Sequence, residues 1–546
     1  MVGSIDANYY RSRSRPSKHA IRSESDSDSL DGIALRLWAS TCRLQASQPS
    51  PFSAAMTDAS AKFLVLKFGG TSVSTAPNWK RITAIIQQRL EAGGPSLKIV
   101  LVHSALSGVT NALTKALDQA LERRRSSDTG NGPHDVQQPA GTHKRTLEEI
   151  MTQHLELAAA LGVPEGEAHV MLEPYHKELK RVLEGASLIG EVSCRTKARV
   201  VAMGELLSTT LGAWAMQAAM PPGSCLWLEA RELLRCSKVP THTRLPDEQV
   251  YLSAVCDFGP DPSLQARLST DEPRVFVTQG FIAANHEGDT VLLGRGGSDT
   301  SAAYLAAMLQ AEGLEIWTDV PGMFTANPRL IPDARLLCAL SFAEAQELAS
   351  TGAKVLHPRC IGPAARHEIP IKICDTFRPH LEGTVISTTS GDSGVVKAIS
   401  VRHGISVVNL ESLGMWQQAG FLADAFNAFK SQAISVDLVA TSESMVSASL
   451  DPDTVAEDAL ERVAEALSEM CTVTFVKECA SISLVGQQIR TTLPSLAPAL
   501  LAFRKHKVHM LTQAANDLNL TFVVDDAVAD SIAIELHATL IERPVQ

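Results

Sequence analysis

The segment KFLVLKFGGTSV, residues 62–73, joins a short apolar run to a pair of glycines. The run from Phe63 to Phe68 predicts a buried strand. Gly69 and Gly70 let the backbone approach a ligand closely, and Lys67 adds a positive charge at the carboxyl end of the strand. Such a turn suits a polyphosphate, although an ordinary strand-to-helix turn is the alternative. The GxxxxGKS/T pattern of a P-loop is absent.

Further apolar runs of the same kind follow along the chain. They are residues 98–103, 274–278, 290–293, 314–317 and 369–373. Helical stretches separate most of them, for example residues 195–218 and 300–312. This alternation predicts stacked βα units around a mainly parallel sheet. The Gly-, Asn- and Pro-rich stretch 126–143 breaks the alternation and predicts an inserted surface loop.

Composition and length narrow the class of protein. A chain of 546 residues with 45% hydrophobic and 20% charged residues predicts a globular protein of two or three domains. The formal net charge of −11 argues against a general nucleic-acid binder. No run approaches the roughly 18 apolar residues that cross a bilayer, so no membrane partner is expected. The ten cysteines show no CxxC or metal-type spacing and predict buried thiols in a reducing compartment.

The two ends of the chain differ from its middle. Residues 1–58 are rich in Ser and Arg and predict a disordered extension. Either this extension is a transit peptide, which would imply a plastid, or the natural start is Met56, and we then expect a cytoplasmic protein. After residue 391, two strand–helix–strand blocks follow and predict ferredoxin-like units at 395–476 and 477–546. Their expected elements are residues 405–410, 421–430 and 434–439, then 480–485, 498–505 and 509–511.

A second glycine-rich turn, residues 292–300, repeats the design of the first. Arg295 stands between glycines and offers a bidentate grip on a carboxylate, as in an amino-acid substrate. Asp299 follows it and has an alternative role as a helix cap.

Other polar residues follow predicted strands or lie in apolar helices. Glu205 predicts a buried partner for a substrate ammonium, with an exposed helical glutamate as the alternative. Ser104 and its neighbours offer hydroxyl groups, which are more often helix caps than ligands. Arg329 and Lys354 stand beside glycine turns and supply further charges for a phosphate, although each turn alone is weak evidence. Together these residues predict phosphoryl transfer, in which several cations and Mg²⁺ neutralise the γ-phosphoryl group.

Six segments in order resemble the aspartokinase family. They are KFGGTSV at Lys67, SALSGVTN at Ser104, GELLS at Gly204, LGRGGSDTSAA at Leu293, WTDVPGMFTANPR at Trp317 and GAKVLHP at Gly352. They cover residues 62–388, and the tail resembles that family's paired ACT domains. The resemblance implies an α/β amino-acid-kinase fold followed by two ferredoxin-like ACT domains. It also implies transfer of the ATP γ-phosphoryl group to the side-chain carboxylate of L-aspartate, the first step of lysine, threonine and methionine biosynthesis.

The resemblance also implies a role for individual residues. The expected catalytic residues are Lys67, Asp299 and Lys354. The expected ATP-binding residues are Lys67, Gly69, Gly70, Ser72, Thr318, Asp319, Phe324, Arg329, Lys354 and Val355, with Mg²⁺ entering with ATP. The expected aspartate-binding residues are Ser104, Thr110, Glu205, Arg295 and Asp299. No general base is needed, because an ionised carboxylate is already a nucleophile. The chain departs from the family at Phe324, where Tyr is usual, and at Asn327, where Asp is usual.

Two segments of the tail, 415–422 and 435–443, resemble the effector site of lysine-sensitive aspartokinases. The expected effector residues are Met415, Gly420, Phe421, Leu422, Ser435, Val436, Asp437, Thr441, Ser442 and Glu443, with Asp437 meeting the effector's ammonium group. Phe421, Leu422 and Val436 are also good core residues, and threonine is the second candidate effector. ACT domains usually pair, which implies a homodimer or larger homo-oligomer. Two rival hypotheses are another amino-acid kinase and a catalytically inactive amino-acid sensor.

Overall fold

A computed structural model describes most of the chain after residue 60. The described residues are 61–128, 142–237, 246–353, 355–389, 396–412, 415, 419–432, 434–451, 457–491 and 493–542. The predicted N-terminal extension, most of the expected loop at 126–143 and Lys354 lie outside these ranges.

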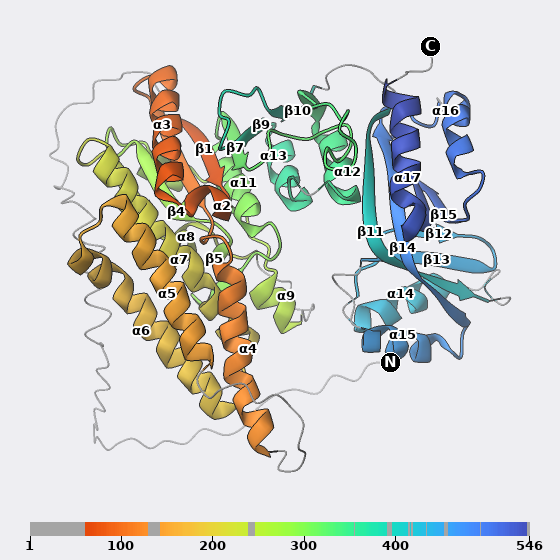
Figure 1. The fold of residues 1–546 in the computed structure, drawn as a ribbon, viewed down its shortest axis with the longest axis horizontal. Coiled ribbons are helices and arrows are strands. Elements are labelled where there is room, and N and C mark those ends of the chain that lie inside the picture. Colours follow the sequence, from red (N-terminus) through yellow and green to blue (C-terminus); the bar gives the residue numbers. More distant parts are fainter. Residues whose placement is uncertain are drawn as a thin grey trace, which may run out of the picture. The chain divides into compact units, whose positions relative to one another are not determined.

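An eight-stranded, mainly parallel sheet organises the first part of the described chain (Figure 1). Its order is β3-β4-β2-β1-β7-β9-β10-β8, and only the β9–β10 pair is antiparallel. The strands are β1 (Lys62–Phe68), β2 (Leu97–His103), β3 (Cys225–Leu228), β4 (Val275–Gln279), β7 (Gly313–Thr318), β8 (Ala339–Ser341), β9 (Ile371–Asp375) and β10 (Thr384–Ser387). This confirms the predicted α/β fold class.

The strand register brings distant segments to one edge of this sheet. Phe68 at the end of β1 lies opposite His103 of β2 and Trp317 of β7. All of β2 is buried, as expected for a strand covered on both faces. The chain leaves β1, β2 and β7 at the same edge, so the polar residues that follow these strands are neighbours in space.

Helices cover the sheet, and α4 to α7 run side by side (Figure 1). The helices of this part are α2 (Gly70–Val73), α3 (Ala76–Gly93), α4 (Val109–Asp128), α5 (Thr142–Leu161), α6 (Glu165–Ile189), α7 (Cys194–Ala219), α8 (Ala230–Leu233), α9 (Asp247–Leu252), α10 (Pro262–Leu268), α11 (Gly297–Leu309), α12 (Phe342–Thr351), η1 (Pro358–Cys360) and α13 (Ile361–Arg366). The loop expected at 126–143 is therefore helical at both of its described ends.

Two predictions for this part need correction. The expected strand 290–293 does not join the main sheet, because β6 (Thr290–Leu292) pairs antiparallel with β5 (Ile282–Ala284). The short turn between them permits a hairpin, whereas a parallel pair needs a long crossover. The helix expected at 300–312 is α11, which begins at Gly297 and ends at Leu309, because Gln310 adopts a left-handed conformation with φ 50°.

A six-stranded antiparallel sheet organises the second part of the chain, in the order β12-β13-β11-β14-β16-β15. Its strands are β11 (Val396–Glu411), β12 (Val439–Thr441), β13 (Met445–Leu450), β14 (Thr472–Gly486), β15 (Val508–Gln513) and β16 (Asn519–Asp525). Its helices are α14 (Phe421–Ser431), α15 (Glu457–Leu467), α16 (Leu493–Leu500), η3 (Leu501–Phe503), α17 (Asp526–His537) and the π-helical η4 (Ala538–Glu542). The long strands β11 and β14 pair along their length (Figure 1).

The sheet of this second part is continuous, while its apolar residues form separate clusters. One cluster contains Phe421 and Phe429 of α14, and another contains Phe503 and Phe522. β14 runs through the domain boundary expected at 476/477, so that boundary stays a prediction.

Two element predictions in this part are wrong or shifted. Of the strand expected at 434–439, only Val439 is in a strand, and the Leu438 N–H donates to the Ser449 hydroxyl instead. The helix expected at 498–505 is shifted, because α16 ends at Leu500 and a short η3 follows. Within the described part of the chain, no helix combines the length and apolar character that crossing a bilayer requires.

Candidate functional site

Lys67 and Asp299 form an ion pair at the carboxyl edge of the large sheet. The Lys67 Nζ atom lies 2.6 Å from Asp299 Oδ1, and both side chains are almost buried. Lys67 comes from β1, and Asp299 comes from the first turn of α11, 232 residues later in the chain. The N-cap of α11 is Gly296, so the alternative that Asp299 is the capping residue is wrong. The pair places one cation at the turn predicted to bind phosphate.

The glycine turn after β1 packs closely against the loop after β2. A Cβ atom on Gly70 would lie 2.8 Å from the Ala105 carbonyl oxygen, so only glycine fits there. The Gly69 N–H donates to the Trp317 carbonyl at 3.3 Å. The Ser72 hydroxyl is buried and lies 2.8 Å from the Thr376 hydroxyl, beyond β9. These contacts fix the turn to the ends of three neighbouring strands.

The two serines Ser104 and Ser298 connect the loop after β2 with the second glycine-rich turn. The Ser104 hydroxyl donates to the Ser298 hydroxyl at 2.9 Å. Thr110 is half-buried in the first turn of α4. The structure therefore brings Ser104 to the turn that carries Asp299.

Glu205 is a buried carboxyl group on α7. Its residue is 2% exposed, so the alternative of an ordinary exposed glutamate is wrong. Burial raises the pKa of Glu205 to about 8, and the Ala105 N–H, which donates to Oε1 at 3.4 Å, offsets only part of this effect. Oε2 has no hydrogen-bond partner among the described residues. A buried acceptor of this kind can pair with a cationic group that enters the site.

Arg295 lies on the exposed turn between β6 and α11. His357 packs under this turn, since a Cβ atom on Gly296 would lie 2.1 Å from the imidazole Cγ. Burial lowers the pKa of His357. The GAKVLHP segment and the GRGGSD turn therefore touch, although Lys354 itself lies outside the described residues.

Arg359 supports the same turn and was not among the predicted site residues. Its guanidinium donates to the Leu293 carbonyl at 2.5 Å, to the Ala254 carbonyl at 3.0 Å and to the Ser253 hydroxyl at 3.3 Å. Ser298, Thr376 and His357 are further residues that the prediction missed. A hydroxyl following a predicted strand was the available signal for Thr376, but the contacts of Arg359 depend on tertiary structure.

The expected nucleotide-binding residues follow β7. The Thr318 hydroxyl donates to Asp319 Oδ1 at 3.1 Å, and Phe324 is half-buried and bridges to Leu336. Arg329 is exposed, and its N–H donates to Asn327 Oδ1 at 3.1 Å. Val355 packs against the core of the large sheet. Thr318 thus shares the edge with Lys67, whereas Phe324 and Arg329 lie on the segment beyond it.

The expected effector residues divide into core and surface groups. Phe421 is buried in the cluster around α14, and Val436 and Met415 pack against that cluster. The exposed members are Leu422, Ser435, Thr441, Ser442 and Glu443, and Gly420 precedes α14 with φ 96°. Core packing is therefore confirmed for Phe421 and Val436 and also holds for Met415, whereas the expected core role of Leu422 is wrong because its side chain is exposed.

Asp437 forms an ion pair with Arg402, which also contacts the end of α12. Its Oδ2 atom lies 2.8 Å from Arg402 Nη1, and Arg402 Nη2 donates to the Ser350 carbonyl at 3.2 Å. Burial raises the pKa of Asp437, and Arg402 offsets part of this rise. A Cβ atom on Gly352 would lie 2.8 Å from the Val401 carbonyl, so the end of α12 rests directly on β11. Asp437 is thus two contacts from the segment before Lys354.

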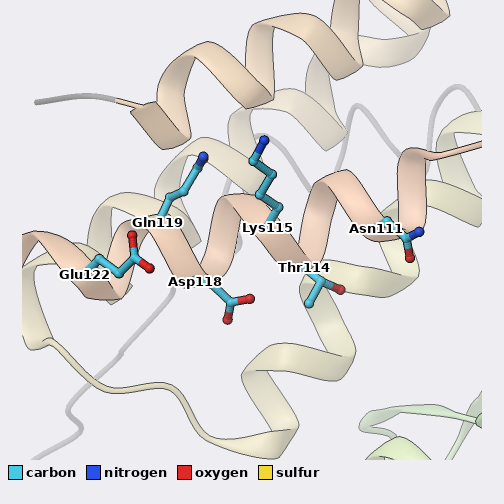
Figure 2. A pocket seen from close by; sticks show the side chains of 6 residues that line it. All are labelled: Asn111, Thr114, Lys115, Asp118, Gln119 and Glu122. Carbon is cyan, nitrogen blue, oxygen red and sulfur yellow. The ribbon is translucent and has the colours of Figure 1, made fainter. Parts of the chain in front are cut away.

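A hollow lies along α4, the helix that also carries Thr110. Figure 2 shows its lining side chains, all from that helix: Asn111, Thr114, Lys115, Asp118, Gln119 and Glu122. None of them is a predicted site residue. No group of three or more potential metal ligands occurs among the described residues.

The chain is similar to known proteins in sequence and in structure. The model of the amino acid kinase family matches residues 62–375. The chain is 30% identical to lysine-sensitive aspartokinase 3 of Escherichia coli, covering 88% of this chain and 100% of the relative. It is 29% identical to the chloroplastic aspartokinase 1 of Arabidopsis thaliana, covering 88% and 80%.

Two solved structures of E. coli aspartokinase III are similar over the same extent. The complex with aspartate and ADP, in the R-state, has a TM-score of 0.72 at 27% identity and covers 88% of this chain and 100% of that one. The complex with lysine and aspartate, in the T-state, has a TM-score of 0.62 at 28% identity and covers 88% and 99%.

Proposed function

Because this chain belongs to the aspartokinase family, we propose that it transfers the γ-phosphoryl group of ATP to the side-chain carboxylate of L-aspartate. The product is 4-phospho-L-aspartate. The observation that carries this proposal is the Lys67–Asp299 pair, which lies at the edge of the sheet where the glycine turn and the loop after β2 meet. The E. coli relative binds aspartate and ADP, which supports both substrates.

The phosphate side of the site consists of the glycine turn and its cations. Lys67 neutralises the transferring phosphoryl group, and Asp299 holds the Lys67 ammonium in position. Lys354 adds a second charge, as the family resemblance implies. Mg²⁺ enters as the MgATP complex and supplies further charge neutralisation when it is bound. Thr318, Asp319, Phe324 and Arg329 line the nucleotide site.

The acceptor side consists of Glu205, Arg295 and the hydroxyls of Ser104 and Thr110. Burial favours the neutral form of Glu205, and the positive charge of the substrate ammonium favours the ionised form, so the carboxyl proton leaves for solvent on binding. Arg295 takes a carboxylate of aspartate. The side-chain carboxylate attacks the γ-phosphorus, an O–P bond forms, and the bond to the ADP oxygen breaks. Catalysis therefore rests on position and charge.

We also propose that the C-terminal tail, residues 395–546, mediates feedback inhibition by free lysine. The ammonium group of lysine binds Asp437 and competes with Arg402 for its carboxylate. Arg402 also lies 3.5 Å from Asp451 Oδ2 and donates to the Ser350 carbonyl, so it keeps a carboxylate partner while bound lysine displaces it and shifts the end of α12, which leads to Lys354. The E. coli relative is lysine-sensitive and has been solved with lysine, which supports this effector. We also propose a homodimer or larger assembly formed through the ACT domains.

The experiment that tests the catalytic proposal traps the acyl phosphate. Purified protein is incubated with ATP, Mg²⁺, hydroxylamine and either L-aspartate, L-glutamate or N-acetyl-L-glutamate, and the hydroxamate is measured. We expect product with L-aspartate and little with the other acceptors. Product with N-acetyl-L-glutamate would instead identify another amino-acid kinase, and a folded protein that forms no product with any acceptor would support the inactive sensor.

A further inference from the structure

Cys236 and Cys256 face each other across a short antiparallel bridge outside the proposed site. The Ser237 N–H donates to the Val255 carbonyl at 2.9 Å, and the Asp257 N–H donates to the Arg235 carbonyl at 3.1 Å. These flanking bonds make the two cysteines a directly opposed, non-hydrogen-bonded pair, whose Cα atoms are typically about 4.5 Å apart. Disulfides join Cα atoms about 4.4–6.8 Å apart. The backbone is thus already at the spacing of a cross-strand disulfide.

The two thiols differ in accessibility and in acidity. The neighbouring Cys256 side chain lowers the pKa of Cys236, while the Cys236 side chain and burial raise the pKa of Cys256. Cys236 is half-buried, whereas Cys256 is buried. A thiolate is the nucleophile in disulfide exchange, so Cys236 is the sulfur that an external oxidant reaches first.

We propose that Cys236 and Cys256 form a reversible disulfide, a modification site that is separate from the phosphoryl-transfer residues. The oxidant is a small-molecule disulfide such as oxidised glutathione. The Cys236 thiolate attacks one sulfur of the oxidant, forms a mixed disulfide and releases one thiolate, which takes up a proton. The Cys256 thiol then loses its proton and attacks the Cys236 sulfur, which releases the second thiol. Two protein thiols are oxidised, and one external disulfide is reduced to two thiols.

The bond joins two segments that support the Arg295 turn. The Cys236 N–H donates to the Ala284 carbonyl of β5 at 2.9 Å. Two residues before Cys256, the Ala254 N–H donates to the Leu292 carbonyl, and Arg359 donates to the Ala254 carbonyl. The neighbouring α9 packs against α7 and β6, and Tyr251 lies against the core, but no side chain of this short helix is fully buried. Oxidation therefore anchors the segment that follows α9 to the segment around Cys236, and it slows the local unfolding of α9.

The test is thiol mapping on the full-length protein in glutathione buffers of graded oxidised-to-reduced ratio. Samples are quenched with acid, alkylated, digested and analysed by mass spectrometry. We expect a linked pair of peptides containing Cys236 and Cys256, with loss of two hydrogen atoms and full recovery after dithiothreitol. Amide exchange of α9 should slow by severalfold in the oxidised protein. Neither readout depends on kinase activity, so the result is independent of the proposed function.

Single serine variants define the order of events. In Cys256→Ser, Cys236 should stop at the mixed disulfide with glutathione, whereas in Cys236→Ser, Cys256 should remain reduced. Cys338→Ser removes an exposed cysteine and should leave the linked pair unchanged. The proposal is overturned if wild-type Cys236 and Cys256 are both alkylated at every ratio while Cys338 acquires glutathione, or if either pairs with another cysteine instead.

Discussion

In the eight-stranded sheet, the candidate binding residues follow the ends of parallel strands. In the six-stranded sheet, they lie beside antiparallel strands and α14. Parallel strands bring Lys67, Ser104 and Thr318 to one edge, although they are far apart in the chain. In the antiparallel sheet, Phe421 is core and Asp437 is held by Arg402. The comparison teaches that a parallel edge gathers distant residues into one candidate catalytic site, while the second sheet presents a partly exposed set and packs on the first part through β11 and β14.

Lys67→Ala should give the largest loss of activity. The substitution removes the cation at the glycine turn and leaves Asp299 without the Lys67 partner, so kcat should fall by about 10³-fold or more. Hydroxamate formation measures the loss, and circular dichroism checks the fold. Lys62→Ala is the matched control, because Lys62 lies on the same strand in an exposed pair with Glu312. Wild-type turnover in Lys67→Ala would refute the role of this lysine.

Lys397→Met tests the junction between the two parts. Lys397 of β11 lies 2.7 Å from Glu344 of α12, and both side chains are buried. Leaving Glu344 ionised without this lysine should lower the free energy of unfolding by about 3–5 kcal/mol. Urea denaturation measures the change. Lys430→Met, on the exposed surface of α14, should shift stability by less than about 0.5 kcal/mol. Equal stabilities for the two variants would contradict a structural role for the pair.

Glu205→Gln should separate catalysis from stability. The variant loses the charge that pairs with the substrate ammonium, so kcat/KM for aspartate should fall by about 10²-fold. The ordinary pKa of a glutamate carboxyl is 4.5, and burial raises the pKa of Glu205 to about 8 in the native state. Between pH 4.5 and about pH 8 the carboxyl is therefore ionised in the unfolded state and neutral in the native state, so the stability of the protein falls as pH rises. Glutamine removes that cost and should stabilise the protein by on the order of 3 kcal/mol at pH 8.

The pH dependence of wild-type kcat/KM for aspartate gives a second readout of Glu205. Since the free enzyme must lose this proton to bind an ammonium group, kcat/KM should rise with pH up to about 8 and level off above that pH. Glu205→Gln should lack that rise, and Glu173→Gln, an exposed change on α6, should keep it. For a single ionisation, kcat/KM should change about tenfold per pH unit below the pKa. A wild-type kcat/KM that stays constant between pH 6 and pH 8 would count against Glu205 as the partner of the substrate ammonium.

Asp437→Ala should have the smallest effect on the uninhibited enzyme and a clear effect on regulation. Losing the carboxylate that meets the lysine ammonium should raise the lysine concentration for half inhibition by about tenfold or more, with basal activity near wild type. Glu461→Ala removes an exposed carboxylate from α15 and is the matched control. Unchanged inhibition in Asp437→Ala would remove this residue from the effector site.

Part of the candidate site could be predicted from the sequence, because those residues belong to local sequence patterns that are typical of a strand followed by a turn. Lys67, Gly69 and Gly70 follow an apolar run, and that run predicts both the strand and the position of the turn. The contacts of Arg359 and the pairing of Cys236 with Cys256 depend on segments that only the tertiary structure brings together. In the second sheet, β13 and α15 went unpredicted, and the 434–438 segment alternates apolar and polar residues like a strand but makes only isolated backbone bonds with Ser449, outside a regular ladder.

The most direct test of this account is the rate of aspartyl hydroxamate formation as free lysine is titrated, with threonine titrated in parallel. The account predicts ATP-dependent turnover in the absence of effector, a progressive fall with lysine and little change with threonine. Inhibition by threonine alone would keep the catalytic claim and contradict the assigned effector. A folded protein that binds lysine yet forms no hydroxamate would contradict the central claim that one chain both phosphorylates aspartate and senses lysine.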